Sequence, residues 1–167
     1  TDVDSTSLIY TVTGSNFAIT SDGTLTFITA PDYETKSSYI GSVTVSDGNL
    51  STTQPITVTV KNLNDNAPTF TSSSSFSADE NQTSIGTVTV TDPDGNLNVI
   101  TYSVSGSELS ITSAGVLSFV TAPDYETKST YTATVTASDG TYSSTQDINV
   151  SVTDENDAPT FKTGATF

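Results

Sequence analysis

A long internal repeat limits what this chain can fold into. The eight residues Ala30–Ser37 (APDYETKS) recur unchanged at Ala122–Ser129, 92 residues further on. The segments before them, Gly14–Phe27 and Gly106–Phe119, align as well. Each copy of such a repeat is expected to be one folding unit. The sequence therefore predicts a chain of similar units.

The predicted boundaries follow from the linkers between the copies. The short polar segments before Pro68 and Pro159 each lead into Ala-Pro-Thr-Phe. We expect units at residues 1–66 and 67–157, with the start of a third at 158–167. The first unit begins at the position of Asp92 in the second, so it is expected to lack its first strand.

Apolar residues alternate with Ser and Thr inside each copy. The segment from Tyr131 to Ala137 and the segment from Ile148 to Val152 both show this period of two. A period of two predicts β-strands with one buried face. About seven short strands in roughly 90 residues are typical of a β-sandwich. The predicted fold class is all-β, with tandem seven-stranded Greek-key β-sandwiches joined end to end.

Charge and composition exclude several classes of function. Four Lys and Arg residues stand against 19 Asp and Glu residues, which gives a net charge of −15. Binding to nucleic acid or to an anionic membrane surface needs a cationic protein. No apolar run approaches the 18 residues of a membrane-spanning helix. The absence of Cys and His removes disulfides and the usual ligands of zinc.

Acidic residues collect beside the turns, often in pairs two residues apart. Asp92 and Asp94 form one such pair, and Asp124 and Glu126 form another. In an extended chain, residues two apart point to the same side. Carboxylate oxygens are the ligands that Ca²⁺ prefers. Calcium is therefore the predicted cofactor.

Five short motifs occur in an order that resembles the cadherin repeat. They are Asp79-Glu80-Asn81, Asp92-Pro93-Asp94, Asp124-Tyr125-Glu126, Ser138-Asp139-Gly140 and the linker from Asn62 to Pro68. The Ser/Thr-rich style without Cys resembles the bacterial cadherin-like repeats of large surface adhesins. The resemblance implies cadherin/immunoglobulin-like sandwiches with Ca²⁺ between consecutive repeats.

The resemblance also implies a set of metal ligands between the first and second repeats. This set is Asp32, Glu34, Asn62, Leu63, Asn64, Asp65, Asn66, Asp92, Asp94, Asn98 and Asp139, with Leu63, Asn66 and Asn98 acting through their carbonyls. Asn62 stands where the family has Asp, and an early Glu of the first repeat is missing. We therefore expect two ions here rather than three, or a water in the gap.

Two further half-sites are implied at the outer ends. One comprises Glu80, Asp124, Glu126, Asp154, Asn156 and Asp157, and the other comprises Asp2, Asp4 and Asp47. Any one acidic turn taken alone is also explained by the preference of Asp for turns. The whole set in family order favours calcium.

The predicted function is structural and not enzymatic. The chain is expected to be a calcium-binding extender or adhesion segment of a large bacterial adhesin, secreted or on the cell surface. Its expected partners are neighbouring repeats of the same chain, with a cell-surface glycan or protein, or a second copy, as further candidates, but no nucleic acid and no inserted membrane. Alternatives are a carbohydrate-binding or homophilic module, and a glycosidase that uses Asp32 and Glu34, or Asp124 and Glu126, as paired carboxylates.

Overall fold

The computed structural model describes residues 7–95 and 99–159. The chain divides into two compact units, Thr1–Leu63 and Asn64–Phe167. All regular structure in the described residues is β-strand. This confirms the predicted all-β class. No helix that could cross a membrane occurs in this part of the chain.

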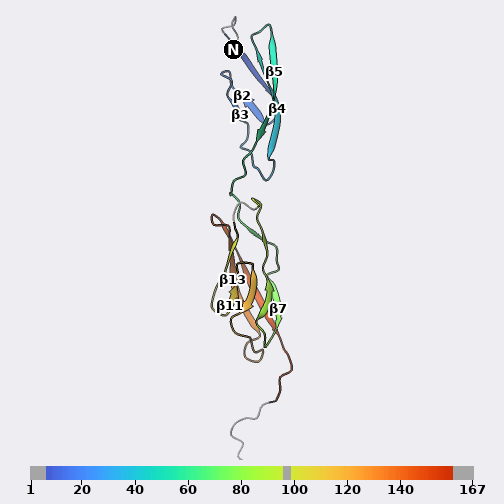
Figure 1. Ribbon diagram of the computed structural model, residues 1–167, viewed down its shortest axis with the longest axis vertical. Helices are drawn as coiled ribbons and strands as arrows, with labels where there is room; N and C mark the ends of the chain where they lie inside the picture. The colour runs from blue at the N-terminus through green and yellow to red at the C-terminus, as the bar shows by residue number, and fades with distance from the viewer. Residues whose placement is uncertain (1–6, 96–98, 160–167) are drawn as a thin grey trace, which may run out of the picture. The chain divides into compact units, whose positions relative to one another are not determined.

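Residues 7–63 of the first unit form five strands in two sheets (Figure 1). They are β1 (Ile9–Thr13), β2 (Phe17–Ile19), β3 (Leu25–Phe27), β4 (Ser38–Ser46) and β5 (Ser51–Thr59). One sheet has the order β1-β4-β5 and the other pairs β2 with β3, all antiparallel. Phe17 and Tyr39 are its buried aromatic residues, and Phe27 packs between them, with ring centroids 5.3 Å and 5.0 Å away.

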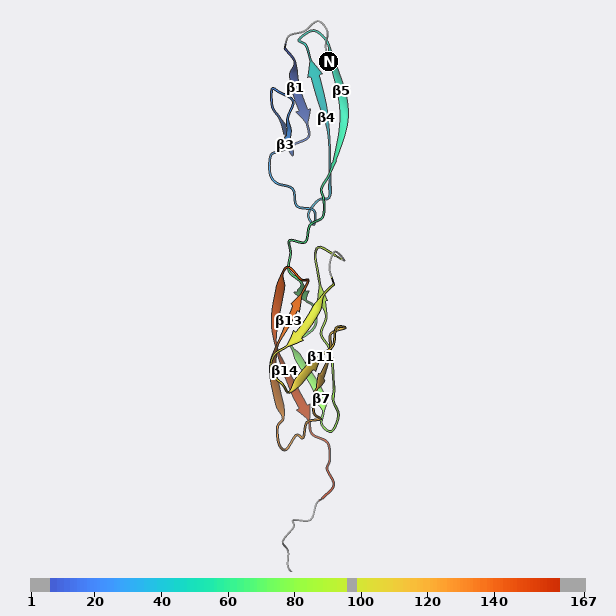
Figure 2. The same cartoon turned by 60° about the vertical axis from the view of Figure 1, so that its left-hand side comes forward.

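The described part of the second unit forms nine strands. They are β6 (Thr69–Phe70), β7 (Ser75–Asp79), β8 (Ser84–Thr87), β9 (Val90–Thr91), β10 (Thr101–Val104), β11 (Leu109–Ile111), β12 (Val116–Phe119), β13 (Thr130–Ser138) and β14 (Ser143–Thr153). One sheet has the order β10-β13-β14-β7, the other has the order β11-β12-β8, and β6 pairs with β9 (Figure 2). The pair β14-β7 is parallel and the others are antiparallel.

The core of the second unit lies between its two larger sheets. The buried apolar residues are Ala78, Val88, Leu109, Leu117, Phe119, Val135, Ala137, Ile148, Val150 and Val152. Those on β12, β13 and β14 occupy alternate positions, as the period of two predicts. Both sheets therefore turn their apolar faces inward, which is the arrangement of a β-sandwich.

A glycine closes the turn between β11 and β12. Gly115 has a φ of 79°, in the left-handed region that favours glycine. A Cβ atom there would lie 2.3 Å from the carbonyl oxygen of Val88. The backbone of Gly115 also accepts a hydrogen bond of 2.8 Å from the Val88 amide. The chain before β9 can approach this turn only because the side chain is absent.

The repeat offers a matched test of how well the two cores are formed. Leu117 is 0% exposed, whereas its counterpart Leu25 is only partly buried. We expect Leu117→Ala to lower the free energy of unfolding of the second unit by about 2–5 kcal/mol. Leu25→Ala should cost the first unit less, because fewer contacts are lost. Hydrogen exchange of the β12 and β3 amides measures each unit separately, and equal costs would contradict this prediction.

Candidate metal centre

Three carboxylates of the second unit come together where β7 and β14 end. Oxygen atoms of Glu80, Glu126 and Asp154 all lie within 4.8 Å of one another. Glu80 follows β7 and Asp154 follows β14, and the parallel register pairs Asp79 with Thr153 just before them. Glu126 comes from the turn that precedes β13. We call this group the carboxylate cluster.

Glu80 holds the other two segments of the cluster in place. It is 3% exposed. Its Oε2 accepts a hydrogen bond of 2.9 Å from the Tyr125 amide, and its Oε1 accepts one of 2.8 Å from the Glu155 amide. The next residue, Asn81, has a φ of 62° and donates its amide to the Pro123 carbonyl at 2.9 Å. Glu80 therefore connects the backbone beside Glu126 with the backbone beside Asp154.

The Asp-x-Glu motif forms a compact turn in both units. In the second unit, Asp124 accepts hydrogen bonds from the amides of Glu126 and Thr127, at 3.1 and 3.3 Å, and from the Thr127 hydroxyl at 2.8 Å. The hydroxyl is the main cause that lowers the pKa of Asp124. This is an Asx turn, and it engages both carboxylate oxygens.

The first unit repeats this turn almost unchanged. Asp32 accepts from the amides of Glu34 and Thr35, at 2.9 and 3.3 Å, and from the Thr35 hydroxyl at 2.8 Å. The identical octapeptide thus produces the same local structure twice. Each Asp maintains the turn and is not a member of the carboxylate cluster, while the Glu two residues later extends from it.

Repulsion between like charges is evident at Glu126. A hydrogen bond from its own backbone favours the charged form, but desolvation and the charges of Glu80 and Asp154 outweigh it and raise the pKa of Glu126. Like charges at such distances disfavour ionisation. A divalent cation would remove this repulsion.

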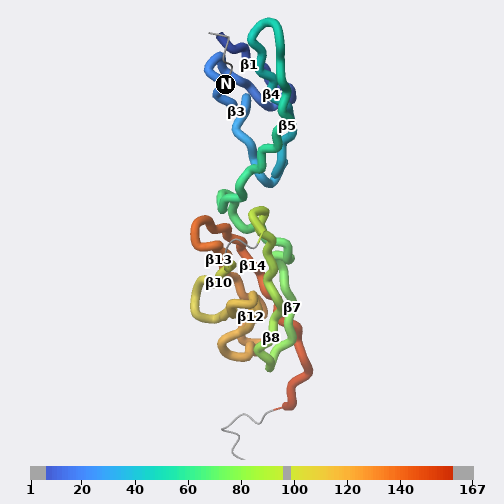
Figure 3. The backbone as a smooth tube through the Cα atoms, turned by 45° about the horizontal axis from the view of Figure 1, so that its top comes forward, coloured from blue at the N-terminus to red at the C-terminus, as the bar shows by residue number. Residues whose placement is uncertain are grey.

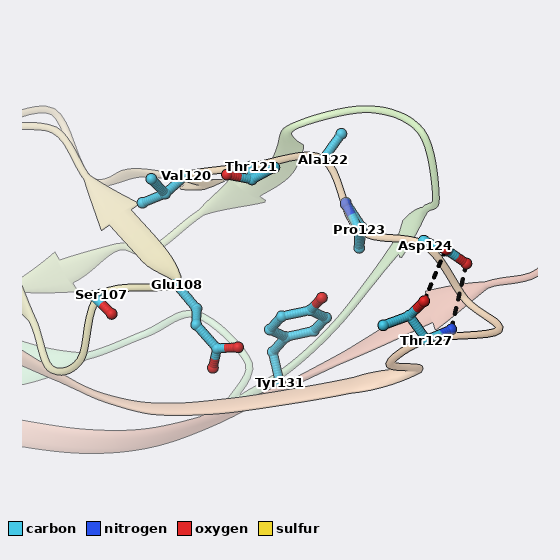
Figure 4. A pocket seen from close by; sticks show the side chains of 9 residues that line it. All are labelled: Ser107, Glu108, Val120, Thr121, Ala122, Pro123, Asp124, Thr127 and Tyr131. Carbon is cyan, nitrogen blue, oxygen red and sulfur yellow. Dashed lines mark hydrogen bonds between the residues drawn. The ribbon is translucent and has the colours of Figure 1, made fainter.

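Lys128 is close to the cluster in sequence but is directed elsewhere. Its ammonium binds both carboxylate oxygens of Glu108, at 2.6 and 2.7 Å, and lies 4.4 Å from the ring centroid of Tyr131. Glu108 and Tyr131 line a pocket together with Val120, Pro123 and Asp124 (Figure 4). Lys128 therefore neutralises Glu108 and not the carboxylate cluster.

Asp94 is one of the metal ligands that the resemblance implies between the first and second repeats. Its side chain is 2% exposed and accepts hydrogen bonds from the amides of Asp65 and Asn66, at 3.1 and 2.9 Å, and from the Asn66 side chain at 2.9 Å. Asp92 in turn accepts from the Asp94 amide at 2.9 Å. Asp94 thus fixes the linker residues that the sequence assigned as ligands.

Asp139 is buried beside the same linker and is 4% exposed. It accepts hydrogen bonds from the amides of Thr141 and Tyr142, at 2.6 and 2.7 Å. Burial alone would raise the pKa of Asp139, but these amides and the side chain of Asn64 outweigh it and lower the pKa. The carboxylate is therefore kept ionised inside the fold.

The remaining sequence-predicted ligands divide into four groups. Asp2, Asp4 and Asn98 lie outside the described residues. Asp47 caps its own turn by accepting the amides of Asn49 and Leu50, at 2.7 and 2.6 Å. Asn62 and Leu63 belong to the first unit, and the exposed residues Asn156 and Asp157 follow Asp154.

Sequence reasoning missed the partners of the cluster. The amides of Tyr125 and Glu155 that bind Glu80 left no signal, because every residue type except proline carries a backbone amide. The Lys128–Glu108 pair was also missed. Its two members are 20 residues apart, and no short motif connects them.

Comparison with known proteins supports the resemblance. Residues 74–153 match the Cadherin domain family model. Protocadherin Fat 4 of Mus musculus is 32% identical over 171 residues, which cover 91% of this chain and 3% of that protein. Chitinase A of Pseudoalteromonas piscicida is 33% identical over 163 residues, covering 96% of this chain and 20% of that protein. The chain therefore spans only a small part of these relatives.

Solved structures of cadherins have a similar fold. Human Protocadherin-24 EC1-2 has a TM-score of 0.77 and 25% identity, covering 93% of this chain and 86% of that chain. Drosophila N-cadherin EC1-4 has a TM-score of 0.74 and 25% identity, covering 90% of this chain and 42% of that chain. By sequence, residues 74–153 match the cadherin domain family model, and by structure the chain has the fold of cadherin extracellular domains.

Proposed function

We propose that this chain binds Ca²⁺ through its clustered carboxylates and acts as an extender or adhesion segment of a bacterial surface adhesin. The observation that carries the proposal is the carboxylate cluster, with oxygen atoms of Glu80, Glu126 and Asp154 within 4.8 Å of one another. Cadherin domains typically bind Ca²⁺ and act in calcium-dependent adhesion. Extracellular modules bind this ion at about 10⁻⁴ to 10⁻³ M.

The chemistry of the cluster fits calcium. Its donors are hard carboxylate oxygens, and the chain has no Cys or His to favour softer metals. Each oxygen of Glu80 accepts one amide hydrogen bond, which leaves acceptor capacity for a cation. A bound ion would also supply the positive charge that Lys128 does not provide.

For the junction between the two units, the proposal is that Ca²⁺ fixes the orientation of consecutive repeats. The cadherin resemblance supports this, with Asp32 and Glu34 from one repeat and Asp65, Asp94 and Asp139 from the next. The burial of Asp94 and Asp139, and their hydrogen bonds to linker and turn amides, also favour a prepared binding surface on the second unit.

A carbohydrate-binding role has weaker support. The chitinase A match favours it, but the Tyr131 ring in the pocket of Figure 4 has Lys128 over its face and Phe119 at 4.9 Å. The pocket therefore offers no open aromatic surface for a sugar ring. A glycosidase role is disfavoured because both oxygens of Asp124 are engaged in its turn.

Calcium titration with a matched pair of variants tests the binding site. Glu126→Gln removes one charge from the cluster, and we expect Ca²⁺ binding there to weaken about tenfold or more, since ligand charge sets affinity. Asp147→Asn removes the same charge from β14, where the Asp147 carboxylate accepts a hydrogen bond from the Thr134 hydroxyl and is not part of the carboxylate cluster. Isothermal calorimetry should show a loss for the first variant alone. Equal effects would mean that net charge, and not the cluster, governs binding.

The same variant should behave in the opposite way without calcium. The raised pKa of Glu126 means that its charged form is disfavoured in the folded state, so Glu126→Gln should raise the thermal midpoint at pH 7 in EDTA. The gain should disappear as the pH falls through the Glu126 pKa, where the native carboxyl takes up a proton. A pH-independent gain would contradict the assigned repulsion.

Small-angle X-ray scattering tests the extender role. Removing Ca²⁺ with EDTA should leave neighbouring carboxylates unscreened and make the linker flexible. We expect the distance distribution to change between millimolar calcium and EDTA, at constant ionic strength because salt screens charges. Identical distributions in both conditions would contradict the proposed role of calcium in fixing repeat orientation.

A further inference from the structure

An Asn-x-Ser/Thr motif lies on the outer face of the four-stranded sheet of the second unit. The motif is Asn149-Val150-Ser151 on β14, and β14 lies between β13 and β7 (Figure 3). Val150 is buried in the core, whereas Asn149 and Ser151 are exposed on the opposite face. Such a motif is an acceptor for N-linked sugars, which need a surface position. The strand therefore turns the acceptor side chain toward solvent.

Asn149 borders a groove on this outer face. The groove has a volume of about 590 Å³ and extends over β13 and β14, between the chain that follows β10 and the chain that precedes β7. Most of its lining residues carry a hydroxyl, carboxylate or amide group, among them Ser74, Ser105, Thr132, Thr134, Asp147 and Asn149. A sugar suits such a lining, because each of its hydroxyls can both donate and accept a hydrogen bond.

Hydrogen bonds of the sheet hold the walls of the groove in place. The Thr134 hydroxyl donates to Oδ1 of Asp147 at 2.7 Å, and the Thr134 amide donates to the Ser105 hydroxyl oxygen at 2.8 Å. The Asn149 amide donates to the Ser74 carbonyl at 2.9 Å, so the backbone of the acceptor is fixed while its side chain is exposed. An ionised carboxylate accepts several hydrogen bonds. Asp147 therefore has capacity left for a sugar hydroxyl.

The chain contains two other motifs of this kind, and the structure places them differently. Asn49 lies in the connection between β4 and β5. Asn81 directly follows Glu80 of the carboxylate cluster, where a bulky sugar would crowd the proposed metal site. Neither of them is among the residues that line the groove. The groove therefore favours Asn149 as the acceptor.

We propose that Asn149 is a site of N-linked glycosylation and that the first sugars of the attached chain lie in this groove. In the transfer, the side-chain nitrogen of Asn149 forms a bond to C1 of the sugar. The bond between C1 and the diphosphate of an activated sugar donor breaks, the diphosphate leaves with the bonding electrons, and the nitrogen loses one proton. The proposal rests on the secreted or surface location in the proposed function and not on calcium binding.

The folded sheet requires that the transfer precedes folding of the second unit. The Ser151 hydroxyl donates to the Phe76 carbonyl at 3.2 Å, and β14 is paired on both sides. The motif includes this hydroxyl. A transferase therefore has access to the hydroxyl and to the backbone of the motif only before β14 joins the sheet.

Mass spectrometry of the protein from its own cells tests the proposal. Cleavage after lysine places each of the three motifs on a separate peptide, and Asn149 lies on that of residues 129–162. We expect this peptide to carry sugar in protein that is recovered from the cell surface or the medium. An unmodified Asn149 in that protein overturns the proposal, although the location on which it rests would then be confirmed.

A pair of variants shows whether the motif directs the modification. Ser151→Ala removes the hydroxyl of the motif, and Ser151→Thr retains one. We expect the sugar at Asn149 to be lost in the first variant and kept in the second. Because the transfer precedes folding, this result does not depend on the stability of either variant. Sugar that persists in Ser151→Ala overturns the proposal.

Enzymatic release of the sugar tests its place in the groove. An amidase that cuts the bond between Asn149 and the sugar should act on the folded chain about tenfold more slowly than on the denatured chain, because the sugar must first leave the groove. Thr134→Val removes the hydroxyl that holds Asp147 and should speed release from the folded chain about fivefold, the equivalent of one hydrogen bond. Thr136→Val, on the same face of β13 but outside the groove lining, is the matched control. Equal release rates from the two variants overturn the placement of the sugar in the groove.

Discussion

The parallel pairing of β7 with β14 determines both the closure of the second unit and the position of its carboxylates. The register sets Asp79 beside Thr153, so Glu80 and Asp154 follow at the same end of the sheet. The same pairing brings Ala78 into the core beside Val152. Burial of apolar surface is the main stabilising term of a fold. Here the burial of apolar surface keeps the carboxylates of Glu80 and Asp154 close together despite their mutual repulsion.

Backbone amides reduce the energetic cost of burying carboxylates at the end of the second unit where β7 and β14 end. Glu80 is almost fully buried, and a buried charge is costly unless it is hydrogen-bonded. Its two amide partners supply those bonds, as the amides of Thr141 and Tyr142 do for Asp139. The carboxylates that are most buried are therefore satisfied by the protein itself. Repulsion remains at Glu126, which is exposed and has no cationic partner among the described contacts.

The period-two pattern predicted much of this fold. Alternate residues on β12, β13 and β14 are buried as expected, because a strand in a two-layer sandwich has one inner face. The motifs also identified Glu80, Glu126 and Asp154 among the candidate ligands. The sequence could not distinguish a carboxylate that forms its own turn from one that faces a neighbouring strand. Asp124 and Glu126 are two residues apart, yet the first is engaged locally and the second contributes to the cluster.

That distinction depends on contacts between distant segments. Whether Glu126 meets Glu80 and Asp154 depends on three strand ends that come together only after the sandwich has formed. The local turn of Asp124 needs nothing beyond residues 124–128 and recurs at Asp32 for that reason. A site whose turns are already formed, and whose carboxylates are already hydrogen-bonded to backbone amides, would lose little conformational freedom when an ion binds. The geometry of the second unit thus favours binding by charge neutralisation, with the ligand segments already held in position by the fold.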